Sequence, residues 1–106
     1  MDQNSRQSED LFAAILALRN KNEARRFLRD LLTEEEISEF SKRWQAAQML
    51  AQKVPYTKIE KLTGLSSTTI ARVAKWLNRG KGGYKLIIQR TSHHKDSSPK
   101  SPPGKD

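Results

Sequence analysis

The stretch that decides the fold runs from Tyr56 to Asn78 and reads YTKIEKLTGLSSTTIARVAKWLN. Two short segments with helical apolar spacing flank Gly64, a residue type that adopts the left-handed conformation of a tight turn at little cost. A helix-turn-helix needs such a turn together with inward apolar residues on both sides of it. The residues that we expect to face inward are Ile59, Leu62, Leu65, Ile70, Val73 and Leu77. The stretch therefore predicts a helix-turn-helix over residues 55–78.

The outer face of the second predicted helix carries the residues that we expect to contact DNA. Polar and basic side chains recur at steps of four, three and four from Thr68 to Arg79, so they form one stripe along the helix. Small hydroxyl residues at its start allow close approach to base edges in the major groove, while Arg and Lys suit guanine edges and phosphates. The predicted DNA contacts are Thr57, Lys58, Ser66, Ser67, Thr68, Thr69, Arg72, Lys75, Arg79 and Lys81. Ser66 is also the predicted N-cap.

The net charge of +8 is unevenly divided along the 106 residues. Residues 1–40 contain six basic and nine acidic side chains, whereas residues 41–106 contain fourteen basic and three acidic ones. This division is typical of a protein in which one part assembles and the other contacts a polyanion. A solvated Lys-rich surface would give the same count, so charge alone leaves the partner open.

Upstream of the motif, the apolar spacing predicts three further helices. The first runs from about Ser8 to Arg19, and either Asn20 or Asn22 can cap the second. The third begins with Thr33-Glu34-Glu35-Glu36, which has the form of a capping box between Thr33 and Glu36. Its apolar stripe, on a helix of about twenty residues that ends near Lys53, consists of Ile37, Phe40, Trp44, Ala47 and Ala51.

Downstream, a last short helix is expected over Tyr84–Gln89. We therefore predict an all-α protein of about six short helices. It is divided into a flexible N-terminus at residues 1–9, a DNA-binding domain at residues 10–90 and a disordered basic tail at residues 91–106. The tail has no large apolar residue with which to build a core.

Composition excludes several classes of function. The chain has no cysteine, which rules out disulfides, thiolate metal sites and cysteine nucleophiles. No apolar run reaches the length of a membrane span, and the polar, acidic start is no signal peptide, so we expect a cytoplasmic protein that binds no membrane. Glu34–Glu36 fit a helix start rather than an acid/base pair, and the adjacent His93 and His94 offer no fixed metal geometry. We expect neither an enzyme nor a metal-binding protein.

Two segments, LLTEEEISEFSKRWQAAQMLAQ (31–52) and YTKIEKLTGLSSTTIARV (56–73), resemble the Trp repressor superfamily. The chain is most similar to the Trp repressor-related YerC/YecD family over about residues 10–90, where LFAAILAL (11–18) and WLNRGKGGY (76–84) also match. The resemblance implies an intertwined homodimer, in which the N-terminal helices of each subunit pack against the other. Such a dimer presents two recognition helices to successive major grooves. It further implies a bacterial, nucleoid-associated transcriptional regulator that acts as a repressor.

The resemblance also raises a tryptophan site. Trp repressors hold tryptophan between two arginines with the help of a threonine carbonyl, and Arg43, Arg72 and Thr33 fall on the matching positions. However, Val73 stands where those repressors have a glycine against the indole, and Trp76 replaces a small hydroxyl residue. Both changes fill or reshape the pocket, so we expect no tryptophan co-repressor and no other cofactor. Each matching residue also has another interpretation: Thr33 caps a helix, Arg43 lies on a solvated helix face, and Arg72 contacts DNA.

Other interpretations stay open on the sequence. A generic helical hairpin with a solvated basic face would show the same pattern, and Glu60 stands where many helix-turn-helix motifs have a small residue. A helical dimer of this charge also suits an acidic protein partner, whereas RNA binding lacks stacking aromatics on a sheet or loop. Trp76 suits core or dimer packing, or a contact with DNA or a ligand. The favoured expectation is a homodimeric regulator of transcription that binds double-stranded DNA.

Overall fold

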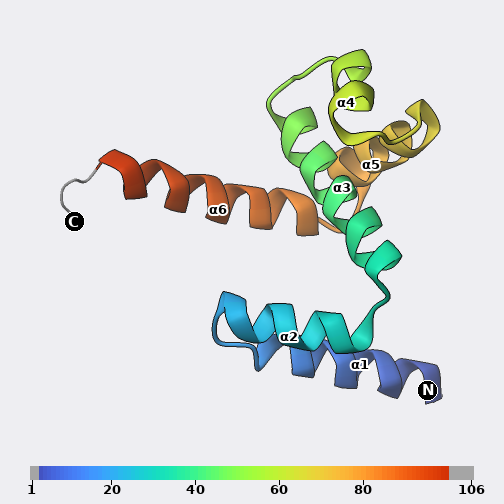
Figure 1. The fold of residues 1–106 in the computed structure, drawn as a ribbon, viewed down its shortest axis with the longest axis vertical. Coiled ribbons are helices and arrows are strands. Elements are labelled where there is room, and N and C mark those ends of the chain that lie inside the picture. Colours follow the sequence, from blue (N-terminus) through green and yellow to red (C-terminus); the bar gives the residue numbers. More distant parts are fainter. Residues whose placement is uncertain (1–2, 101–106) are drawn as a thin grey trace. The chain divides into compact units, whose positions relative to one another are not determined.

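Six helices make up the described part of the chain in this computed structural model (Figure 1). The backbone is described for residues 3–100 and the side chains for residues 5–92. The helices are α1 (Gln3–Leu16), α2 (Lys21–Leu31), α3 (Glu34–Ala51), α4 (Tyr56–Thr63), α5 (Ser67–Arg79) and α6 (Gly83–Lys100). No strand occurs among residues 3–100, so the expected all-α class is confirmed there.

Side-chain caps fix the starts of α2 and α3. The Asn20 Oδ1 atom accepts a hydrogen bond from the Glu23 N–H at 2.9 Å, and the Glu23 carboxylate accepts one from the Arg19 N–H at 2.9 Å. The predicted capping box is present at α3, where the Glu36 N–H donates to Thr33 Oγ1 at 3.1 Å and the Thr33 N–H donates to Glu36 Oε1 at 2.9 Å. Both caps satisfy N–H groups that a helix start leaves without partners.

The first helix begins earlier than the sequence predicts. Residues 3–9, expected to be flexible, belong to α1, which ends at Leu16 rather than near Arg19. The prediction located this helix by its apolar residues, and these mark only the face that packs. Gln, Arg and Glu have favourable helix propensity, so a helix can extend through them without a core. Residues 1–2 lie outside the described part of the chain.

The last helix is longer than predicted. The sequence predicted a short helix over Tyr84–Gln89 and a disordered tail from residue 91, whereas α6 continues to Lys100. The Thr91 hydroxyl donates to the Ile87 carbonyl at 2.8 Å, so this polar side chain is satisfied within the helix itself. A lack of large apolar residues removes tertiary packing but leaves the internal hydrogen bonds of a helix intact. Residues 101–106 and the side chains of His93 and His94 lie outside what the structure describes.

The chain divides between Glu39 and Phe40 into two compact units. In the first unit, none of the residues from 5 to 39 is buried. Five of its large apolar side chains are exposed, namely Leu11 (37%), Phe12 (53%), Ile15 (45%), Leu16 (85%) and Leu31 (47%), and its others are half-buried. An apolar surface on this scale is typical of a site of protein–protein contact.

The second unit has a small core to which α3, α4, α5 and α6 contribute. Its buried residues are Ala46, Ala47, Ile59, Leu65, Ile70 and Val73, and the partly buried residues that pack around them are Trp44, Met49, Leu50, Val54, Tyr84 and Ile88. The Trp44 and Tyr84 rings stack with centroids 6.3 Å apart, which ties α6 to α3. Figure 1 shows α4 and α5 beside the C-terminal half of α3, where the small side chains of Ala46 and Ala47 permit close packing.

Three positions that were predicted to face inward are exposed. Leu62 is 56% exposed, and its neighbour Thr63 is buried in its place. Ile59 and Thr63 lie four residues apart on the face of α4 that packs against the core. Leu62 lies outside this face and is exposed for that reason. On α3 the predicted stripe holds for Ala47, but Phe40 is 46% exposed and Ala51 is exposed as well. Trp44 is partly buried against the core, as expected.

Candidate nucleic-acid interface

The turn between α4 and α5 has the geometry that a helix-turn-helix requires. Gly64 ends α4 with φ 79° and ψ 3°, and its N–H donates to the Glu60 carbonyl at 2.8 Å. A Cβ atom at this position would meet no atom within 4 Å, so glycine is favoured here by the backbone conformation rather than by space. The predicted role of Gly64 is confirmed. The carboxylate-bearing Glu60 accepts this bond through its backbone only and does not obstruct the turn.

A buried hydroxyl that the sequence analysis missed braces the same turn. Thr63 is 5% exposed, and its hydroxyl donates to the Ile59 carbonyl at 2.7 Å. The same oxygen accepts a hydrogen bond from the Leu65 N–H at 3.1 Å. One side chain thereby satisfies two backbone groups at the corner, and Leu65 is held in the core as predicted. The signal in the sequence was the threonine directly before the turn glycine, since threonine bonds readily to nearby backbone.

The hydroxyl residues at the start of α5 divide into two pairs. Ser66 is the N-cap, since its Oγ accepts from the Thr69 N–H at 3.1 Å and donates to Thr69 Oγ1 at 3.1 Å. These two side chains therefore hold the helix start in shape. Ser67 and Thr68 are exposed. Of the four predicted contacts at the tip, Ser66 and Thr69 therefore have a structural role in the helix start, and Ser67 and Thr68 stay predicted base-edge contacts.

The two faces of α5 differ as the sequence predicts. Ile70 and Val73 are fully buried, and Leu77 is 7% exposed. The opposite face carries Arg72 and its basic neighbours, all of them exposed. We name this face the basic stripe, which consists of Thr68, Arg72, Lys75 and Arg79. Since a buried face anchors α5 along its whole length, the stripe projects from a rigid helix rather than from a mobile loop.

The predicted contacts outside α5 occupy two places in the second unit. Thr57 and Lys58 are exposed in the first turn of α4, where the Lys58 N–H donates to the Pro55 carbonyl at 3.1 Å. Lys81 is exposed in the turn that leads from α5 to α6. The segment from Lys61 to Lys95, both ends included, contains eight basic residues and no acidic one. Because the segment has no carboxylate of its own to pair with these cations, its charge favours binding of an external anion.

The residues that match a tryptophan site have other roles. Thr33 belongs to the capping box, the guanidinium of Arg43 lies 5.6 Å from the centroid of the Phe40 ring, and Arg72 is exposed on the basic stripe. Val73 is 0% exposed within the core cluster. In this chain Val73 is thus part of the hydrophobic core. The expectation that tryptophan does not bind stays a prediction.

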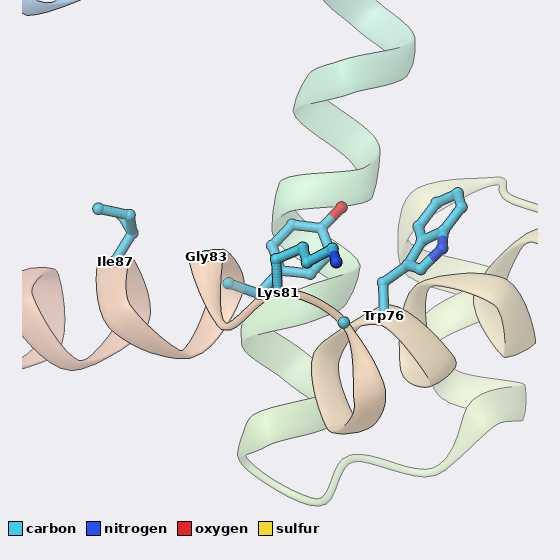
Figure 2. Close-up of a pocket in the computed structure, with 6 residues that line it drawn as sticks. Trp76, Lys81, Gly83 and Ile87 are labelled. Carbon is cyan, nitrogen blue, oxygen red and sulfur yellow. The ribbon is translucent and has the colours of Figure 1, made fainter.

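A hollow that the sequence analysis did not predict lies at the turn between α5 and α6 (Figure 2). Its volume is about 630 Å³, and it is lined by Trp76, Gly80, Lys81, Gly83, Tyr84 and Ile87. Trp76 is 42% exposed, so it does not belong to the core of this chain. Dimer packing and a contact with DNA or a ligand both stay open for this residue. Gly80 is required here, because a Cβ atom would lie 2.3 Å from the Trp76 carbonyl oxygen.

No helix within the described chain has the length and apolar character needed to cross a membrane. Among the described residues, no cluster of three or more His, Asp or Glu side chains is placed to hold a metal ion.

Comparison with known proteins places this architecture in a family. The Trp repressor protein family model matches residues 6–92. The uncharacterized protein YerC of Bacillus subtilis is 38% identical over 90 residues, which are 85% of this chain and 86% of YerC. A TrpR-like protein from Eubacterium eligens has a similar structure, with a TM-score of 0.79, 39% identity and coverage of 82% of this chain and 90% of its own.

A second solved structure, described as a candidate Trp repressor from Staphylococcus aureus, gives a TM-score of 0.78 at 36% identity and covers 87% of this chain and 96% of its own. These likenesses extend over the helix-turn-helix and both flanking regions, and they confirm the expected all-α, Trp repressor-like fold. The chain therefore belongs to the Trp repressor family, as a YerC-like member.

Proposed function

We propose that this protein is a transcriptional regulator, acting as a repressor, that binds a specific double-stranded DNA site as a homodimer. The observation that carries the proposal is the exposed basic stripe on α5, which stands opposite a buried apolar face and directly after a left-handed turn at Gly64. Family membership supports the same class of function. A protein of this kind acts on the bacterial nucleoid in the cytoplasm.

In this proposal α5 enters the major groove by its N-terminal end. Ser67 and Thr68 are small enough to let the helix approach the base edges, and Arg72 reaches a guanine. Lys75, Arg79 and Lys81 then contact phosphates, which fix the register but carry no sequence information. Thr57 and Lys58 contact the backbone from the start of α4, and the backbone N–H groups at the start of α5 favour a phosphate oxygen.

The apolar surface of the first unit supports the proposed homodimer. Phe12, Ile15 and Leu16 are among the exposed residues of α1, and a second copy of the chain would bury them. Two copies related by a twofold axis carry two recognition helices, which suits a pseudo-palindromic site with half-sites about one helical turn apart.

Selection of fragments from random duplex DNA tests this function. We expect the purified protein to enrich a palindromic sequence, and we expect the Arg72→Ala variant to lose enrichment at one position of each half-site. The matched control is Arg25→Ala, which removes the same charge from an exposed position on α2 and should leave the selected sequence unchanged. Failure to enrich any sequence, together with capture of an acidic protein through the basic stripe, would support a protein-interaction module instead.

We further propose that DNA binding does not depend on tryptophan. The sequence resemblance supports this, because Val73 stands where Trp repressors have a glycine against the indole, and here Val73 is buried in the core. Calorimetric titration of the protein with tryptophan should give no heat of binding at millimolar ligand. DNA affinity should be the same with and without tryptophan, and a tryptophan-dependent rise in affinity would contradict the proposal.

A further inference from the structure

We propose that Glu60 selects a cytosine in each half-site of the DNA, by accepting a hydrogen bond from the N4 amino group of that base. The inference rests on the proposed function above and adds a specificity-determining residue to it, at a base pair other than the one that Arg72 reads. Glu60 is the one acidic residue between Glu39 and Asp96. Its carboxylate is therefore the one charge of the helix-turn-helix that opposes binding of a polyanion.

The Glu60 carboxylate has no partner within the described part of the chain. A cation on the same helix would pair with it from three or four residues away. The residues at these positions, none of them a cation, are Tyr56, Thr57, Thr63 and Gly64. No hydrogen bond or ion pair involves the Glu60 side chain among the described residues. The fold thus leaves this charge available to a donor from outside the chain.

The side chain of Glu60 is half-buried, yet its carboxylate reaches the surface. Every buried side-chain oxygen among the described residues has a hydrogen-bond partner. The oxygens of Glu60 have none, so they are not buried, and the half-buried part of the residue is its stem. A side chain whose stem is packed loses less conformational freedom when its head group binds.

Glu60 lies on the part of α4 that comes closest to the recognition helix along the chain. It follows Thr57 by three residues, so the two share one face of α4, and its carbonyl accepts the Gly64 N–H at 2.8 Å in the turn before α5. In a helix-turn-helix the first helix crosses the DNA backbone, and the start of the second meets the base edges. Glu60 therefore lies between the proposed backbone contact at Thr57 and the exposed tip of α5 at Ser67 and Thr68.

The chemistry of a carboxylate limits what it can meet in DNA. An ionised carboxylate only accepts hydrogen bonds, and phosphate oxygens repel it. In the major groove guanine and thymine present acceptors, cytosine presents its N4 amino group, and adenine presents an N6 amino group beside the acceptor N7. Because N7 repels a carboxylate, cytosine is the preferred base. Repulsion from phosphates weakens binding to every sequence, and the bond to cytosine offsets it only at the correct one, so Glu60 increases specificity.

Selection from random duplex DNA with Glu60 variants tests this role. We expect the wild type to enrich cytosine at one position of each half-site, and we expect Glu60→Ala to lose that preference. The affinity of Glu60→Ala for a random duplex should rise about threefold or more, because a negative charge beside phosphates is removed. Glu60→Gln should shift the preference from cytosine to adenine, the base with which a glutamine amide pairs.

The matched control for charge is Glu35→Ala. Glu35 is exposed in the first turn of α3, so this variant changes the net charge by the same amount as Glu60→Ala. It should select the same sequence as the wild type. Loss of the cytosine preference in Glu35→Ala would show that overall charge, and not Glu60, sets the selected sequence.

A modified base tests the hydrogen bond itself. In the selected duplex, 2-pyrimidinone in place of the cytosine removes the N4 amino group and leaves the rest of the ring unchanged. We expect the affinity of the wild type to fall about fivefold or more, and that of Glu60→Ala to fall less than about twofold, because the variant has no carboxylate that depends on the amino group. Fluorescence anisotropy at constant salt measures both. An equal loss for the two proteins would overturn the inference.

The remaining outcomes distinguish this inference from the proposed function. If the wild type enriches a palindromic site and Glu60→Ala selects the same bases, the inference fails and the proposed function stands, even if binding to random DNA rises. If the wild type binds no duplex DNA, the proposed function fails and the inference fails with it. Should Glu60→Ala not fold, Glu60→Gln decides the question through the shift from cytosine to adenine.

Discussion

Single side chains set the shape of the turn that positions the recognition helix. Thr63 is the clearest case, because one buried hydroxyl bonds to backbone groups on both sides of the corner. The capping residues Thr33 and Ser66 and the turn glycine Gly64 could be predicted from the sequence, since each acts through its own local backbone. Leu62 could not, because its exposure depends on how the short helix α4 is rotated against α3 and α5. Roles that depend on the local backbone could therefore be predicted from the sequence, and the rotation of a helix against its neighbours could not.

The Thr63→Val substitution tests the buried hydroxyl. The variant keeps the shape of the side chain but leaves the Leu65 N–H without its acceptor, so we expect the free energy of unfolding to fall by about 1–2 kcal/mol. Urea denaturation followed by circular dichroism measures this loss. The control is Thr57→Val at an exposed position, which should change stability by less than about 0.5 kcal/mol. Equal effects at the two positions would argue against a bracing role for Thr63.

Arg72 and Lys81 are predicted to act differently on DNA. Arg72→Ala should weaken binding to the selected site by roughly 1–3 kcal/mol and relax preference at one base pair, because a base-edge contact is lost. Lys81→Ala should weaken binding to selected and random duplexes alike, because a phosphate contact carries no sequence information. Fluorescence anisotropy with both duplexes distinguishes the two. Parallel losses for both variants on both duplexes would refute the division of roles.

At the scale of the helices, the starts that carry a side-chain cap could be predicted from the sequence. The Thr33–Glu36 box and the Ser66 cap lie where the sequence predicts them. Both ends of α1 and the C-terminal end of α6 differ from the prediction, because apolar spacing reports the packed face and not the length of a helix. The hollow beside α5 was missed for a related reason. It arises from the relative placement of Trp76, the glycine turn and Ile87, which no single segment encodes.

Gly64 after α4 and Lys53 after α3 both have a left-handed backbone, and we expect substitutions at the two positions to change stability in opposite directions. Gly64→Ala should lower the free energy of unfolding by about 1 kcal/mol, since a Cβ is unfavourable at φ 79° even where space is free. Lys53, with φ 66°, is the one non-glycine residue with positive φ in the described chain, so Lys53→Gly should raise stability by up to about 1 kcal/mol. Thermal unfolding of both variants measures these changes. A stabilising Gly64→Ala or a destabilising Lys53→Gly would contradict the backbone argument.

At the scale of the whole molecule, the uneven charge along the chain matches the different surfaces of its two units. Residues 1–40 carry an excess of acidic groups and an exposed apolar surface, and residues 41–106 carry fourteen of the twenty basic groups and the core. Both the charge division and the apolar residues could be predicted from the sequence. Which apolar residues stay exposed in one subunit could not, because exposure depends on the partners that a helix meets in three dimensions.

Replacement of apolar residues on α1 should weaken self-association. Phe12→Ser and Ile15→Ser each remove an exposed apolar side chain from the surface that we propose a second copy covers. We expect the dimer dissociation constant to rise at least tenfold, measured by analytical ultracentrifugation, because buried aromatic and aliphatic anchors dominate such interfaces. Gln7→Ser, an exposed polar change on the same helix, serves as the control. A wild-type protein that stays monomeric at high micromolar concentration would remove the basis of this prediction.

The salt dependence of binding to the selected duplex tests the central claim most directly. If two subunits each place Lys58, Lys75, Arg79 and Lys81 on phosphates, with Arg72 adding to the count, the plot of log K against log salt should have a slope between about −7 and −9. The Lys75→Ala variant removes one contact from each subunit and should reduce the magnitude of that slope by about 1.8. A slope near zero, or a slope that Lys75→Ala leaves unchanged, would contradict the account of α5 as the DNA recognition helix of a dimer.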